Sequence, residues 1–259
     1  MKQPLAYIHP AAKIASSVVI DPFVTIDANV EIGEGTRILS GATILEGSRI
    51  GQNCTIFPGA VIGAVPQDLK FKGEETYAVI GNNTTVRECA TINRGTSARG
   101  KTVVGNNCLI MAYSHVAHDC IIGDNVILAN ATQLAGEVTV DDFAILGGGT
   151  LVHQFCHLGA HIMVQGGALI NKDIPPFAKA AREPIAYTGI NSVGLRRRGF
   201  SSEAIRDIQQ VYRYIYMMGF NVSEAVDRIE AELPATPERD EILQFIRNSK
   251  RGIIRGYFS

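Results

Sequence analysis

The sequence predicts a parallel β-solenoid followed by a small C-terminal helical domain, and three observations support this prediction. An isoleucine, valine or leucine recurs every six residues over most of the chain up to Ile170. A small or β-branched residue stands two positions before most of these large residues. After Ile170 the repeat stops, and a Pro-rich segment leads into sequence with helix-capping signals. A period of six held this long fits neither an α-helix nor a heptad coiled coil, which leaves stacked short strands.

The large residue of each hexad recurs without interruption from Ile8 to Ile62. It resumes at Ile80 and again at Val104, from which it continues to Ile170. Residues two apart on a strand share one face, so each hexad is a short strand with one large and one small inward side chain. The intervening turns, such as "IGEG", "IGQN" and "IGDN", contain Gly and Asn, which tolerate the backbone of a tight corner. Each coil would then be stabilised by stacking on its neighbours.

The small inward position also explains most of the cysteines. It holds four of the five, namely Cys54, Cys108, Cys120 and Cys156. Free Cys packs as a small hydrophobe, so we expect these four to fill the core. Cys89 lies off this position and is assigned no role.

Two polar, Gly-containing stretches interrupt the repeat, at residues 64–78 ("AVPQDLKFKGEETYA") and 93–102 ("NRGTSARGKT"). Long loops in an otherwise strict repeat are often functional. We call them the first and second excursions. The solenoid with both excursions is predicted to cover residues 1–187, and the helical domain to cover residues 188–259.

Three helices are expected in the C-terminal domain. The first covers residues 201–219, with Ser201 or Ser202 as its N-cap. The second covers 223–232. The third begins after Thr236, which acts as N-cap and is followed by a proline at the first helical position.

Composition excludes several classes of protein. The chain has 259 residues, is 46% hydrophobic and has a net charge of −1, which argues against a nucleic-acid-binding surface. No stretch is apolar enough to span a bilayer, and the first residues lack the apolar core of a signal peptide. We therefore expect a soluble cytoplasmic protein without a transmembrane segment.

The stretch "AYSHVAHDC", residues 112–120, contains two of the six histidines of the chain. His115 and His118 flank the inward Val116, so both are expected to face outward. Asp119 follows directly after His118. These three polar residues are the first candidates for a functional site.

Stacking brings further residues to the same place. If three hexads make one coil, Gly136 lies one coil beyond His118 and Gln154 lies two coils beyond, at about 4.8 Å per step. His153 is adjacent to Gln154. We therefore expect His118, Gly136, His153 and Gln154 to cluster along one edge of the solenoid.

This cluster has the parts of an acyl-transfer site. A neutral His is a suitable general base at physiological pH, and Asp119 would fix its tautomer and stabilise the imidazolium. A glycine at position 136 exposes a backbone N–H that suits an oxyanion. No Ser or Cys nucleophile stands in the column, so an acceptor hydroxyl would attack the acyl carbonyl directly.

Two hypotheses other than acyl transfer are a zinc site and a non-catalytic binding protein. Hexapeptide-repeat carbonic anhydrases bind zinc between subunits, but zinc needs three suitably placed protein ligands and an open position. The H-x-x-H spacing here differs from their usual H-x-x-x-x-H, so no metal site is predicted. The other alternative is a non-catalytic β-solenoid binding protein, such as an ice-binding or adhesive one. Those proteins need flat, regular ladders of outward Thr, whereas this chain has loops and a helical tail.

The sequence resembles the hexapeptide-repeat left-handed β-helix proteins. Within them it resembles the acyl-carrier-protein–UDP-N-acetylglucosamine O-acyltransferases, which begin lipid A synthesis. The resemblance covers nearly the whole chain and rests on "QDLKFKGE", "TINRGT", "HVAHDCIIGD", "VHQFCHLGAH" and "NSVGLRRRGFS". It implies an all-β fold with left-handed triangular coils. It also implies a homotrimer with its sites in the clefts between neighbouring solenoids.

The resemblance implies that His118 deprotonates the glucosamine 3-hydroxyl, which attacks the thioester of a 3-hydroxyacyl carrier protein. Asp119 would orient His118, and the Gly136 amide would hold the oxyanion. No cofactor is implied, because the donor is a phosphopantetheine thioester on acyl carrier protein. The implied substrate-binding residues are His115 on the sugar and, beside it, Asp68 and Lys70 lining the cleft. His153 and Gln154 would bind the nucleotide sugar or acyl region, and the uridine diphosphate would be bound by Asn191, Arg197 and Arg198. Arg suits phosphate because its fork bonds bidentately.

Gly166 matches the position that sets acyl length in this family. A glycine there leaves the acyl groove open, so a long 3-hydroxyacyl chain is expected, and a bulky residue would shorten it. Over residues 194–213, five Arg stand against Glu203 and Asp207, which suits an acidic carrier protein.

Three positions depart from the family pattern. Glu137 and Asn93 stand where His is common, and Val193 stands where Glu is common. These positions bear on secondary binding contacts, and a nearby Glu137 carboxylate would favour the imidazolium form of His118. The alternative within this fold is a UDP-3-O-acylglucosamine N-acyltransferase. That family carries an extra N-terminal uridine-binding domain, for which a repeat that begins at Ile8 leaves no room.

Overall fold

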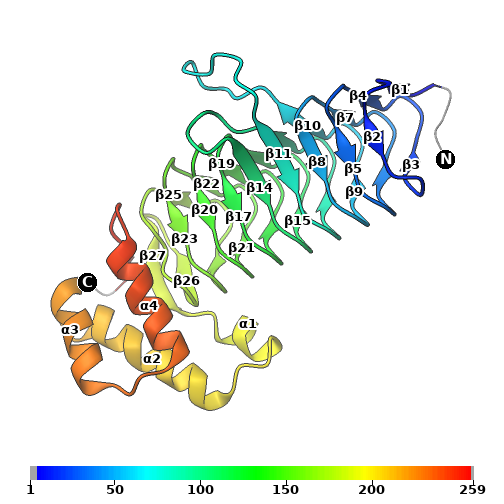
Figure 1. Ribbon diagram of the computed structural model, residues 1–259. Helices are drawn as coiled ribbons and strands as arrows, with labels where there is room; N and C mark the ends of the chain where they lie inside the picture. Colours follow the sequence, from blue (N-terminus) through cyan, green and yellow to red (C-terminus); the bar gives the residue numbers. More distant parts are fainter. Residues whose placement is uncertain (1–4, 258–259) are drawn as a thin grey trace.

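The structure is a computed structural model that describes residues 5–257. Figure 1 shows a long solenoid of short strands with a cluster of helices at its C-terminal end. Successive strands alternate among three sheets, which form the three faces of a prism. The predicted all-β fold, a left-handed parallel β-helix followed by a small helical domain, is confirmed.

We number the three sheets in the order in which the chain first enters them. Sheet 1 contains β1 (Tyr7–Ile8), β4 (Thr25–Ile26), β7 (Thr43–Ile44), β10 (Val61–Ala64), β13 (Thr91–Asn93), β16 (His115–Val116), β19 (Gln133–Leu134), β22 (Leu151–Val152) and β25 (Leu169–Ile170). Sheet 2 contains β2 (Lys13–Ile14), β5 (Glu31–Ile32), β8 (Ser48–Ile50), β11 (Tyr77–Ile80), β14 (Lys101–Val104), β17 (Ile121–Ile122), β20 (Thr139–Val140) and β23 (His157–Leu158). Sheet 3 contains β3 (Val19–Ile20), β6 (Arg37–Ile38), β9 (Thr55–Ile56), β12 (Thr85–Val86), β15 (Leu109–Ile110), β18 (Ile127–Leu128), β21 (Ile145–Leu146), β24 (Met163–Val164), β26 (Ala178–Ala181), β27 (Ala186–Ile190) and β28 (Arg255–Gly256).

The chain turns between sheets at three kinds of corner. Corner 1–2 leads from sheet 1 to sheet 2 and includes residues 117–120, 135–138 and 153–156. Corner 2–3 includes 123–126, 141–144 and 159–162. Corner 3–1 includes 111–114, 129–132, 147–150 and 165–168. The three kinds of corner form three different long edges of the prism.

The hexad register places the core as predicted. The large inward residues are buried, among them Ile20, Ile56 and Ile110, each of which is 0% exposed. The four cysteines on the small inward position are also buried, which confirms that prediction. Burial raises the pKa of the Cys120 thiol to about 12, so this cysteine is a core residue rather than a reactive thiol.

Both excursions are shorter than the sequence analysis expected. Sheet 1 strand β10 continues through Ala64, and β11 already begins at Tyr77. Likewise β13 continues through Asn93, and β14 begins at Lys101. The reason is that residues at the ends of each excursion keep pairing with the next coil, as Tyr77 does with Lys101. These strand ends were not predicted because the residues around them are polar and do not follow the six-residue repeat.

The helical domain contains four helices within the described residues: α1 (Ser192–Arg197), α2 (Ser202–Met217), α3 (Val222–Glu232) and α4 (Pro237–Asn248). The Ser201 side chain accepts a bond from the Ala204 amide, and that of Thr236 from the Arg239 amide, so both are N-caps. Helix α2 ends two residues earlier than expected, and α1 was not predicted. No helix within residues 5–257 is long and apolar enough to cross a membrane.

The predicted domain boundary at residues 187/188 is wrong in detail. It falls inside β27, which pairs antiparallel with β26 and parallel with β28. The chain from beyond the helices therefore returns to extend sheet 3. The boundary was missed because these three strands do not carry the six-residue repeat.

His161 joins the solenoid to the helical domain at corner 2–3. Its ring stacks on Phe143 with centroids 4.8 Å apart and meets the edge of Phe200 at 5.1 Å. Its carbonyl accepts a bond from the side-chain amide of Asn191 at 2.9 Å, just before α1. Burial, together with the charge of Arg198, lowers the pKa of His161 from 6.5 to about 4.

This lowered pKa predicts an acid-dependent loss of stability. Between pH 6.5 and 4 the unfolded chain binds a proton at His161 that the folded chain does not. The stabilisation is therefore complete above pH 6.5 and is lost as the pH falls towards 4, by at most about 3 kcal/mol. We expect His161→Phe to flatten the pH dependence of the free energy of unfolding in this window, measured by urea denaturation. His153→Ala, at an exposed histidine, should leave the slope unchanged. Parallel curves for wild type and His161→Phe would contradict the assignment.

Candidate active site

The site centres on His118, at corner 1–2. Adjacent residues on a strand point to opposite sides, but the corner puts Asp119 in the left-handed region with φ 59°. Both side chains can then converge, and His118 Nδ1 lies 2.9 Å from Asp119 Oδ2. Asp tolerates this backbone conformation better than most residues. The His–Asp pair of the sequence analysis is therefore present in the structure.

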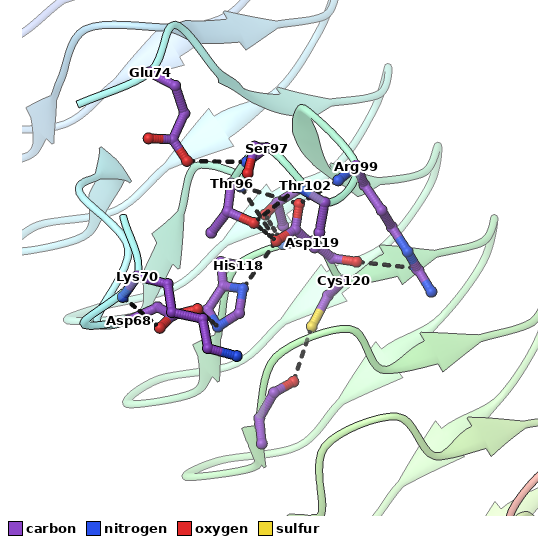
Figure 2. A network of polar contacts seen from close by, with 12 residues as sticks. Asp68, Lys70, Glu74, Thr96, Ser97, Arg99, Thr102, His118, Asp119 and Cys120 are labelled. Atoms are coloured by element: carbon purple, nitrogen blue, oxygen red, sulfur yellow. Dashed lines mark hydrogen bonds and ion pairs between the residues drawn. The ribbon is translucent and has the colours of Figure 1, made fainter. Parts of the chain in front are cut away.

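Asp119 is completely buried, and the second excursion surrounds its carboxylate, as Figure 2 shows. Thr96 and the Arg99 amide both bond to it. The sequence analysis did not single out either residue. The one available signal was the excursion itself, since its residues follow no repeat that would indicate which of them turn inward.

Gly136 lies against the His118 ring, as the stacking prediction required. The Glu137 amide bonds to the His118 carbonyl at 3.0 Å, and the Phe155 amide bonds to the Gly136 carbonyl at 3.2 Å. A Cβ added to Gly136 would lie 2.5 Å from both Cε1 and Nε2 of His118. A residue with a side chain at position 136 would therefore collide with the imidazole in this position.

The first excursion brings a second carboxylate to the base. Asp68 Oδ2 lies 3.9 Å from His118 Nε2, the ring nitrogen that faces away from Asp119. The Lys70 amide bonds to Asp68 Oδ1 at 2.9 Å, while its side chain is exposed beside the site. Buried Asn93 donates to the Val65 carbonyl at 2.8 Å, so it holds the start of this loop.

His115 lies on strand β16 of sheet 1, three residues before His118. Its Nδ1 is 2.7 Å from the Thr91 hydroxyl. Burial lowers the pKa of His115, and the charge of His118 adds to this, so His115 is neutral at physiological pH. Two coils beyond His118, His153 is exposed and its Nδ1 contacts the Gln154 carbonyl at 3.0 Å.

The structure does not bring the remaining predicted residues to this corner of the same chain. The Asn191 side chain caps α1 and bonds to the His161 carbonyl, at corner 2–3. Arg198 bonds to the Phe143 carbonyl at 3.0 Å on that same corner, and Arg197 is exposed.

Gly166 lies at corner 3–1, exposed and stacked beside Gly148. The candidate residues therefore occupy three different edges of the prism.

Glu137 lies at the same corner as the base, directly after Gly136. It occupies the left-handed position of its corner, with φ 60°. Within residues 5–257 its carboxylate forms no hydrogen bond or ion pair with His118, whose two ring nitrogens face Asp119 and Asp68. Val193 is exposed on α1.

The arrangement can hold an acceptor hydroxyl and remove its proton. Nδ1 of His118 is committed to Asp119, which leaves Nε2 as the basic nitrogen. Nε2 faces Gly136 on one side and the first excursion on the other. Among residues 5–257, no three His, Cys, Asp or Glu side chains are grouped as a metal site would require.

Comparisons with known proteins place the chain among acyltransferases. Residues 173–254 match the model described as "Udp N-acetylglucosamine O-acyltransferase; Domain 2". Residues 101–136 match "Bacterial transferase hexapeptide (six repeats)", and 2–106 match the GMPPB C-terminal domain.

Relatives match over nearly their full length. An acyl-[acyl-carrier-protein]–UDP-N-acetylglucosamine O-acyltransferase of Sulfurihydrogenibium sp. is 51% identical, with 96% of this chain and 93% of that protein covered. The protein of that name from Janthinobacterium sp. is 46% identical, with 97% and 98% covered. Among solved structures, LpxA, a UDP-N-acetylglucosamine acyltransferase from Bacteroides fragilis 9343, matches with a TM-score of 0.97 at 59% identity, covering 98% of this chain and 100% of that one.

Proposed function

The chain belongs to the UDP-N-acetylglucosamine O-acyltransferase family, and from this premise we propose how its corner 1–2 carries out the reaction. The enzyme transfers a 3-hydroxyacyl chain from acyl carrier protein to the glucosamine 3-hydroxyl of UDP-N-acetylglucosamine. This is the first step of lipid A biosynthesis. We propose that it acts in the cytoplasm and without a resident metal or cofactor, because the thioester already supplies an activated acyl group.

His118 is the general base in this mechanism. Its Nδ1–H donates to Asp119, so Nε2 accepts the proton of the 3-hydroxyl as that oxygen attacks the thioester carbonyl. The N–H of Gly136, a residue that lies against the His118 ring, stabilises the oxyanion of the tetrahedral intermediate. When the C–S bond breaks, the phosphopantetheine thiolate leaves and takes the proton from the imidazolium. The ester and a free thiol are the products.

One observation carries this mechanism. Nε2 of His118 faces a backbone glycine, while Nδ1 is held by a buried carboxylate. A base and an oxyanion donor thereby adjoin the same small space. Asp68, on the first excursion, is suited to accept a bond from a sugar hydroxyl there.

The predicted site residues of one chain lie on three different edges of the prism, and this distribution supports a homotrimer. His118 and Gly136 lie at corner 1–2, Arg198 at corner 2–3 and Gly166 at corner 3–1. The edges of one prism face different directions, so a single substrate can contact residues of all three kinds only where copies of the chain meet. We propose that each site lies between neighbouring solenoids, with the UDP-binding arginines and the acyl groove contributed by more than one chain.

Exposed basic residues support docking of acyl carrier protein. Arg196 and Arg197 on α1 and Arg206 and Arg213 on α2 are all exposed. All four belong to the first two helices of the C-terminal domain, and their positive charge suits an acidic partner. The exposed Gly166 backbone supports an open acyl groove and a long acyl chain.

The test offers UDP-N-acetylglucosamine, and in a parallel assay UDP-3-O-acylglucosamine, with a series of 3-hydroxyacyl carrier proteins of increasing chain length to wild type and Gly166→Met. We expect wild type to prefer a long donor and Gly166→Met to prefer a shorter one, as judged by mass spectrometry of the products. EDTA should not reduce the rate. Transfer only to UDP-3-O-acylglucosamine would instead identify the N-acyltransferase. Loss of activity with EDTA would favour the zinc-site hypothesis.

A further inference from the structure

The second excursion is built around the carboxylate of Asp119. Asp119 Oδ1 accepts bonds from the Thr96 amide at 3.0 Å and the Arg99 amide at 3.1 Å. Asp119 Oδ2 accepts a bond from the Thr96 hydroxyl at 2.6 Å, lies 3.2 Å from the Thr96 amide, which also reaches this oxygen, and lies 2.9 Å from His118 Nδ1. The hydroxyl of Thr96 and the imidazole of His118 therefore share one oxygen atom.

The direction of the Thr96 hydroxyl bond is determined by a neighbour. The Ala98 amide donates to Thr96 Oγ1 at 3.2 Å, so this contact uses the hydroxyl as an acceptor. The single hydroxyl proton of Thr96 is then free to point at Asp119 Oδ2. Because Asp119 is an acceptor when ionised, its Oδ2 in turn receives the Nδ1–H of His118.

The excursion is anchored on both sides of Thr96. The Asp119 amide donates to the Thr102 hydroxyl at 2.8 Å, and Arg99 Nη1 donates to the Asp119 carbonyl at 3.0 Å. The Ser97 amide donates to Glu74 Oε1 at 3.0 Å, which joins the second excursion to the first (Figure 2). Thr96 itself is only 7% exposed. The hydroxyl therefore cannot easily leave the carboxylate.

We propose that Thr96 is a positioning residue for the reaction, acting through Asp119 on the tautomer and direction of His118. This rests on the proposed function of His118 as general base. Without the Thr96 hydroxyl, the two amides would still hold Oδ1, but Oδ2 would keep only the longer contact from the Thr96 amide at 3.2 Å and could shift relative to His118 Nδ1. With Thr96 bound to Oδ2 and two amides bound to Oδ1, the oxygen that receives Nδ1–H has one position, and Nε2 stays unprotonated and aimed at the substrate.

The test compares Thr96→Val, which keeps the shape and removes the hydroxyl, with Thr96→Ser, which keeps the hydroxyl. We expect Thr96→Val to lower kcat about 10- to 100-fold with little change in the KM for UDP-N-acetylglucosamine, as for loss of a bond to a charged group. Thr96→Ser should recover most of the rate. Thr96→Ala offers the same comparison if the valine variant folds poorly. A ¹⁵N spectrum should show His118 protonated at Nδ1 alone in wild type and as mixed tautomers in Thr96→Val.

Thr76→Val is the matched control. Thr76 is also buried, at 2% exposure, but its hydroxyl has no hydrogen-bond partner within the described residues. The same substitution there should leave kcat and the His118 spectrum unchanged.

Combination with Asp119→Ala separates this inference from the proposed function. If Thr96 acts through Asp119, adding Thr96→Val to Asp119→Ala should lower kcat no further. A full additional loss in the double variant, or a normal kcat in Thr96→Val while His118→Ala is inactive, would overturn the role of Thr96 alone. Normal activity in His118→Ala would overturn the proposed function.

Discussion

Replacing His118 with alanine is expected to lower kcat by at least about 100-fold, the usual contribution of a positioned general base. Both ring nitrogens of the His118 side chain have close neighbours in the structure. Its Nδ1 is bound to buried Asp119, and its Nε2 lies against Gly136. The alanine variant keeps the backbone of corner 1–2, so its melting temperature should change little. The rate is measured with UDP-N-acetylglucosamine and the preferred 3-hydroxyacyl carrier protein.

His9→Ala is a suitable control, since His9 lies in the first coil, far along the solenoid from the site. Near-normal turnover by His118→Ala would eliminate the base mechanism.

The His118→Ala variant also tests the proposed homotrimer. Mixed with Arg197→Ala chains, His118→Ala chains should regain part of the activity if one site draws on two chains. No recovery from two variants that are each inactive and correctly assembled would place the whole site on one chain.

Gly136→Ala is expected to lower kcat by at least about 100-fold while leaving the fold intact. Its new methyl group would lie 2.5 Å from two ring atoms of His118, so the imidazole must move away from the oxyanion donor. The backbone N–H at position 136 remains in the alanine variant, but displacement of a catalytic group by about 1 Å already carries an effect of this size.

The fold should tolerate this alanine because the backbone does not require glycine there. Gly136 is not among the glycines with positive φ, and the same hexad position holds Asp124, Asp142 and Ala160 at corner 2–3. A melting temperature close to wild type, with the rate lost, is the expected pair of results. An unchanged rate would show that the space beside Nε2 is not where the oxyanion forms.

The six-residue repeat made most of this fold predictable. Each hexad repeats the same local choice of inward residues, so the register that buries Ile110 also turns His115 and His118 outward. Stacking by whole coils then placed Gly136 beside His118 without any knowledge of the structure. The ends of the excursions and the boundary inside β27 (Ala186–Ile190) were misjudged because these segments pair with neighbours without carrying the repeat.

By itself, the sequence determined the solenoid, its register and the column of polar residues at one corner. The reason is that the pattern of buried and exposed residues is local and is repeated in every hexad. Only the tertiary structure decided how that column is held. The second excursion has no period, yet it folds back so that Thr96 and the Arg99 amide surround Asp119. The prism also put Arg198 and Gly166 on other edges than His118, a separation that depends on where the whole chain turns. Contacts between segments far apart in the chain decide such positions, and no repeat encodes them.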